Sequence, residues 1–203
     1  MKPKALINLP KWTYVVEAAA VFAMAAYFFQ LQGYAWADYI SPCGTLVEIA
    51  IWAAIVLDLK KRDMIGPGLI VVLGLSLLLS LVSDVVSFFS DDFLAPGLYM
   101  IVWLTAMVWL TAMVMISVSY SGLFKKYAII DIACFFGVAA LSVGMDLFDV
   151  GTSGSLFSGI MKYVALPLLY FPYQALVNAI NEGVEDDEEG VEVGEGETDT
   201  ETE

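Results

Sequence analysis

The chain has 203 residues, 60% of them apolar, which is well above the roughly 45–50% apolar content of soluble domains. Nine basic residues stand against 23 acidic ones, and histidine, the commonest general base and zinc or copper ligand, is absent. We therefore expect an all-α integral membrane protein that is not an enzyme and uses no cofactor or metal. Nucleic-acid binding is not expected either, because no basic patch with interleaved aromatic residues occurs outside the apolar runs.

The acidic charge is concentrated at the C-terminal end of the chain. Residues 182–203 carry 12 of the 23 acidic residues and no basic one, so the rest of the chain has a net charge of only −2. The segment has no aromatic residue and cannot bury enough apolar area to offset its ordering, which predicts a disordered acidic tail. Two interpretations stay open, a docking segment for a basic cytosolic partner and a solvated end suited to high salt, as in a halophile.

Residues 1–11 carry three lysines and no acidic residue, and they precede a first apolar run that begins at Trp12. The run could be a signal peptide with a cleavage site at 35–37, where small residues flank Trp36. A retained membrane helix is favoured, because the run exceeds the roughly 7–15 residues of a signal-peptide core and contains Glu17.

Six apolar runs are long enough to cross a bilayer, which takes about 17–25 residues of helix. They cover approximately residues 12–31, 42–58, 65–90, 93–120, 127–148 and 156–180. The sequence thus predicts a six-transmembrane-helix bundle over residues 12–181, with kinks in the last helix at Pro167 and Pro172, which each lack a backbone donor.

The basic residues of the loops predict the orientation of this bundle. With six spans, the N-terminal lysines, the basic cluster at 60–62 and the lysine pair at 125–126 all fall on one side of the membrane. The loops of the other side contain acidic residues and no basic one. The positive-inside rule then places both termini in the cytoplasm of a multi-pass cell-membrane protein. The expected partners are the lipid bilayer itself and either further copies of the chain or other subunits of a membrane complex.

The third run, residues 65–90, carries a polar stripe. Successive residues of a helix are rotated by 100° about its axis, so the polar residues of this stripe fall within an arc of about 100° of the helix surface. They are Ser76, Ser80, Ser83, Asp84 and Ser87. Since hydrocarbon offers a carboxylate no partner, we expect this face to contact other helices or a hydrated cavity.

Four ionisable residues are expected to form one layer in the outer part of the membrane, by their helical rise of about 1.5 Å per residue. They are Glu48, Asp84, Asp146 and Lys162. Because Lys162 is the only basic residue in a span away from the cytoplasmic end, we expect it to pair with Asp84 or, failing that, with Glu48 or Asp146. Glu17 and Asp131, by contrast, are expected near the cytoplasmic surface, within reach of lysines.

The fourth run contains a tandem hexapeptide, Val-Trp-Leu-Thr-Ala-Met, at 102–107 and again at 108–113. Six residues turn a helix through about 600°, so the two copies are predicted to face different directions and Trp103 and Trp109 not to stack. We interpret the duplication as drift.

Two functions remain compatible with these patterns. The first is an ion or proton channel, or a small-solute transporter, centred on the charge layer and the serine stripe. The second is a non-catalytic structural or assembly subunit, whose polar residues hold helices together at about 0.6–2 kcal/mol per hydrogen bond and whose tail docks a partner.

Overall fold

The computed structural model describes residues 10–32, 34, 36, 40–89, 95–149 and 155–192, and over these residues it contains helices and no strand. The six helices, in chain order, are α1 (Pro10–Leu31), α2 (Ser41–Lys61), α3 (Pro67–Phe89), α4 (Ala95–Ser119), α5 (Gly122–Asp149) and α6 (Ser155–Glu192). The predicted all-helical fold is confirmed. Within the described residues, four helices contain a stretch long and apolar enough to cross a membrane, namely α1, α3, α4 and α6.

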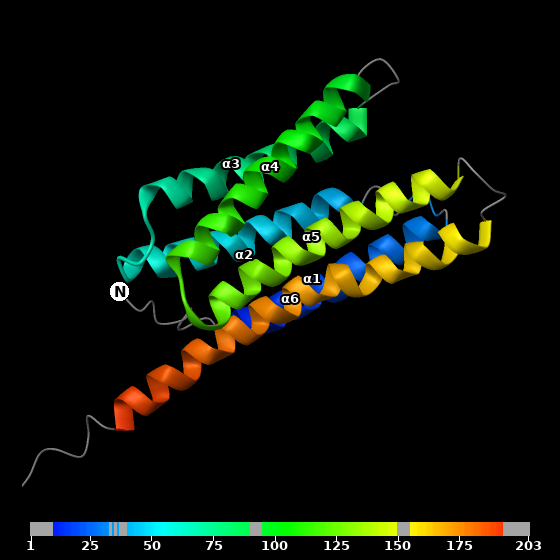
Figure 1. Cartoon of the computed structure of the whole chain (residues 1–203). Helices are drawn as coiled ribbons and strands as arrows, with labels where there is room; N and C mark the ends of the chain where they lie inside the picture. The colour runs from blue at the N-terminus through cyan, green and yellow to red at the C-terminus, as the bar shows by residue number, and fades with distance from the viewer. Residues whose placement is uncertain are drawn as a thin grey trace, which may run out of the picture.

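The helices pack in the order in which they occur in the chain. Each packs against the next, and α6 returns to pack against α1, which closes the cycle. In Figure 1 the α3–α4 pair and the α1–α6 pair lie on opposite sides of α2 and α5. Side chains of α2 and α5 therefore meet the other helices in the interior of the bundle.

Helix α5 begins at Gly122, five residues before the predicted start of the fifth span. Gly122 has a φ of 71°, which favours glycine because a side chain would be strained there, and it lets the chain reverse directly after α4. Lys125 and Lys126 consequently lie on the exposed surface of the first turns of α5, where a loop was expected. Asp131 consequently lies about 14 Å from the start of the helix, at 1.5 Å per residue.

Helix α6 continues to Glu192 and passes through Pro167 and Pro172 without a break. Residues 182–192 are thus helical, which differs from the disorder that their composition predicts. Glutamate is a good helix former, and extending an existing helix is far easier than nucleating one, so packing of the preceding part of α6 is sufficient to start it. Figure 1 shows this extension leaving the bundle. Residues 193–203 lie outside the described part.

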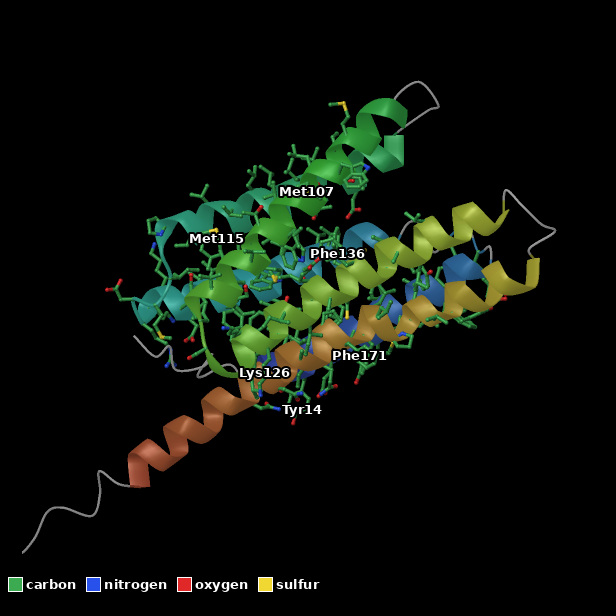
Figure 2. All side chains as sticks on the ribbon, viewed as in Figure 1. Tyr14, Met107, Met115, Lys126, Phe136 and Phe171 are labelled. Atoms are coloured by element: carbon green, nitrogen blue, oxygen red, sulfur yellow. The ribbon has the colours of Figure 1, made fainter. Side chains whose placement is uncertain are left out.

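One end of the bundle carries the basic residues, and we call it the basic end. Here Lys60 and Lys61 end α2, and Arg62 forms an ion pair of 3.1 Å with Asp58. The hydroxyl of Tyr120 donates to the carbonyl of Met64 at 3.0 Å and ties the turn between α4 and α5 to the turn between α2 and α3. Figure 2 places Lys126 and Tyr14 at this same end.

The hydrophobic core is fully packed near the basic end. Its largest side chains there come from five of the helices and include Ile55, Leu59, Leu73, Ile116, Phe124 and Ile180, all 3% exposed or less. By contrast, large apolar side chains are exposed along the outer surface, among them Val71, Met100, Trp103, Val118 and Phe136. An exterior this apolar is unusual for a soluble monomer and is typical of a surface that contacts lipid.

Candidate functional site

A cavity of about 260 Å³ lies in the bundle interior between α2, α4, α5 and α6. We call it the aromatic cavity, because four of its lining residues carry aromatic rings with a polar atom, and two carboxylates, Glu48 and Asp131, join them. The four aromatic residues are Trp52, Trp109, Tyr127 and Tyr173. The ring of Trp52 meets that of Trp109 edge to face, at 5.4 Å and 85°, and that of Tyr127 at 6.0 Å and 43°.

Asp131 is held in the aromatic cavity by a single described side-chain hydrogen bond. The indole Nε1 of Trp109 on α4 donates to Oδ2 of Asp131 on α5 at 2.8 Å. The bond joins two neighbouring helices and satisfies both a Trp donor and a carboxylate, groups that need partners when they are buried. The described partner of Asp131 is thus an indole on a neighbouring helix, whereas the sequence led us to expect a lysine.

Helix α6 contributes to the same cavity through one of its internal prolines. Pro172 has no N–H to donate to the carbonyl of Leu168, one turn earlier, and both residues line the cavity. On the facing helix, a Cβ at Gly137 would come within 3.2 Å of Leu168, so glycine allows α5 and α6 to approach closely here.

A second cavity, of about 360 Å³, lies between α2, α3 and α4, and we call it the polar cavity. It is bordered by three residues of the serine stripe, Ser80, Ser83 and Asp84. Thr45 on α2 donates from Oγ1 to Oδ2 of Asp84 on α3 at 2.5 Å, and this bond joins the two helices. The stripe thus faces both another helix and a cavity, the two surroundings expected for it.

Glu48 lies where the cavities meet. It lines the aromatic cavity, the polar cavity and a third, mainly apolar cavity of about 520 Å³ between α1 and α2. Its side chain interacts electrostatically with both Asp131 and Asp84. Three carboxylates from α2, α3 and α5 therefore line neighbouring cavities that share Glu48 in their walls.

No basic side chain among the described residues forms an ion pair with these three carboxylates. A carboxylate within a membrane normally pairs with a base, accepts hydrogen bonds or faces a water-filled cavity. Asp84 and Asp131 each accept one hydrogen bond, from Thr45 and Trp109, whereas Glu48 borders open space on several sides. In the described part of the chain, acidic residues and cysteines form no group of three that could hold a metal ion.

Four further residues belong to the predicted charge layer and stripe. The side chains of Asp146, Lys162 and Ser87 lie outside the described residues, so the predicted ion pair of Lys162 stays a prediction. The helix order does not favour its pairing with Asp84, because α3 packs against α2 and α4 while α6 packs against α5 and α1. Ser76, the remaining serine of the stripe, is 1% exposed, and its hydroxyl has no partner among the described residues.

The two copies of the hexapeptide face different directions, and this prediction is confirmed. Trp103 of the first copy is 64% exposed on the outer surface, whereas Trp109 of the second is hydrogen-bonded to Asp131. For the threonines, the first copy supplies the interior residue, because Thr105 lines the polar cavity and Thr111 is exposed. The repeat therefore places one member of each pair in the interior.

The sequence did not single out Asp131, Trp52, Tyr127 or Tyr173 as site residues. Aromatic residues in an apolar helix more often contact lipid or pack against other helices than line a site, and nothing in the spacing of these residues distinguishes the two roles. The signal that was present is the pair of prolines in α6, which mark a helix with free carbonyls. No family model, curated protein or solved structure matches the chain.

Proposed function

We propose that the protein carries small cations, protons included, across a membrane through the interior of its helix bundle. One observation carries this proposal. Glu48, Asp84 and Asp131 line neighbouring cavities of a largely apolar bundle, and no described basic residue pairs with them. Leaving a charge in such surroundings costs about 2.5–3.5 kcal/mol on insertion scales, and a bound cation or proton removes that cost.

The packing supports a gated carrier rather than a permanently open pore. The polar cavity lies toward the end opposite the basic end, since Asp84 is about 8 Å from the C-terminal end of α3. The third cavity, which is mainly apolar, extends to Tyr14 at the basic end. At the basic end, the fully buried apolar core fills the interior. The cavity that leads from Glu48 to Tyr14 is mainly apolar, so it offers a cation no polar route to the basic end until the packing rearranges, and such rearrangements are how carriers alternate access.

We further propose that all six helices span the membrane, with both ends of the chain in the cytoplasm. Helices α2 and α5 have 21 and 28 residues and complete the closed cycle of packed helices, so they share the membrane with their neighbours. The basic residues of the described turns gather at one end, which the positive-inside rule places in the cytoplasm.

This topology predicts which cysteine reacts from outside the cell. Cys43 is exposed near the start of α2, at the end opposite the basic residues, whereas Cys134 is buried. A membrane-impermeant maleimide added to intact cells should label Cys43 and leave Cys134 unlabelled until the protein is denatured. Labelling should disappear in Cys43→Ser. Labelling of Cys43 only after the cells are opened would place this end of the bundle in the cytoplasm and reverse the orientation.

The transport proposal is tested by flux in liposomes. The purified full-length protein is reconstituted, and uptake of protons, potassium and small organic cations is followed with internal reporters under an applied membrane potential. We expect flux that saturates with cation concentration, because a carrier presents a limited number of sites. Liposomes with the protein but no flux of any cation would contradict the proposal.

One observation favours the alternative, a structural or assembly subunit. The helical extension of α6 beyond the bundle carries acidic residues and no basic one, which fits docking to a basic partner. The liposome flux measurement distinguishes the two functions, since a purely structural subunit conducts no cation when it is reconstituted alone.

A further inference from the structure

We infer that the aromatic cavity is a binding site for a small methylated organic ammonium ion, whose charge is balanced by Glu48. This inference rests on the proposed cation function and names the class of cation. It follows from the composition of the cavity wall, the availability of Glu48, and the size of the enclosed space.

The cavity wall provides aromatic faces set at angles to one another. Trp52 and Tyr127 are 2% and 3% exposed, because they pack against each other at 43° and Trp52 packs edge to face on Trp109. The ring surface available to a ligand therefore belongs to the half-buried lining rings, which come from α4, α5 and α6 and are Trp109, Phe135 and Tyr173. A ring face is electron-rich and attracts a cation within about 6 Å, and cages of this kind are a common recognition mode for quaternary ammonium groups. Aromatic residues of all four helices thus contribute to the lining.

Of the two carboxylates in the cavity, Glu48 is the one free to balance a ligand's charge. Asp131 already accepts the indole N–H of Trp109, which fixes its position. Glu48 borders the cavity, has no ion-pair partner among the described residues, and also borders the polar cavity through which a cation can approach.

The donor set does not suit a metal ion. Calcium takes six to eight oxygen ligands and magnesium requires near-octahedral oxygen coordination, whereas the cavity offers two carboxylates among rings and aliphatic side chains. A methylated ammonium ion is held differently, because its methyl groups are weakly hydrated and fit against aromatic and aliphatic surfaces. At the roughly 30 Å³ that one water occupies in the liquid, a cavity of about 260 Å³ holds about nine heavy atoms.

Binding is measured on the purified full-length protein in detergent, by calorimetry and by tryptophan fluorescence, with tetramethylammonium and choline as probes. We expect saturable binding of both probes. The neutral carbon isostere of choline, in which carbon replaces the nitrogen, should bind at least about tenfold more weakly, because it has choline's shape without its charge. This comparison requires no variant. Equal affinity for choline and the isostere would overturn the inference.

Variants then locate the site. Tyr173→Phe keeps a ring and should bind choline nearly as well as the wild type, whereas Tyr173→Leu removes the ring and should weaken binding about tenfold. Glu48→Gln should weaken it by a similar factor, and Glu17→Gln, which alters an exposed glutamate of α1, should not. Unchanged binding in both Tyr173→Leu and Glu48→Gln would place the ligand elsewhere and overturn the inference.

Binding and transport can fail independently. If potassium or proton flux depends on Glu48 but neither ammonium probe binds, the ligand class is wrong and the proposed cation function stands. If choline binds in the expected way but no cation crosses the liposome membrane, the site is real and the transport function is wrong.

Discussion

Replacing Glu48 with glutamine is expected to reduce cation flux in liposomes by about tenfold or more while leaving the bundle folded. Glutamine keeps the shape of the side chain and removes the charge that attracts the cation, and interactions with a charged group are worth about 1.5–3 kcal/mol, or roughly 10- to 150-fold. Because Glu48 borders the aromatic cavity, the polar cavity and the third cavity, the change alters all three of them.

The matched control is Glu17→Gln, which removes the same group from an exposed position on α1. Flux in this variant should equal that of the wild type, and both variants should elute as the same species in detergent. A Glu48→Gln protein that is folded and conducts normally would show that the carboxylate is structural, and would shift the balance to the assembly-subunit function.

The second large effect concerns stability and the hydrogen bond between Trp109 and Asp131. Trp109→Phe should lower the free energy of unfolding by about 1–3 kcal/mol, because it leaves the Asp131 carboxylate in the bundle without the described donor. Adding Asp131→Leu to this variant should recover part of the loss, since removing both polar partners avoids the unsatisfied group. Unfolding in mixed micelles with increasing denaturing detergent measures each free energy.

The control for this cycle is Trp103→Phe, the equivalent change in the first hexapeptide copy, at a position 64% exposed on the outer surface. It should change the stability by no more than about 0.5 kcal/mol. Effects of Trp109→Phe and Asp131→Leu that simply add would mean that the two side chains do not interact, since contacting pairs usually show coupling of about 0.5–3 kcal/mol.

Much of the fold could be predicted from the sequence because a bilayer imposes a simple length and polarity rule on each helix. The first four helices begin and end within about three residues of the predicted bounds, as in α3, predicted at 65–90 and observed at Pro67–Phe89. The start of α5 was missed because the charges of Lys125 and Lys126 led us to assign them to a loop. Basic residues are also tolerated on the exposed first turns of a helix. The helical extension of α6 was missed because composition predicts disorder and takes no account of a helix already nucleated next to it.

Some features of the candidate site follow from residue spacing along one helix, and others follow only from the packing of the helices. The sequence by itself determined the helices, the polar stripe of α3 and the different directions of Trp103 and Trp109, since these depend on residue spacing along one helix. Which helices are neighbours was decided by the tertiary structure alone, because the packing of one helix on another depends on the shapes of both surfaces. That packing brought Asp131 to Trp109 and Glu48 to the junction of the cavities, and separated the helix of Asp84 from that of Lys162.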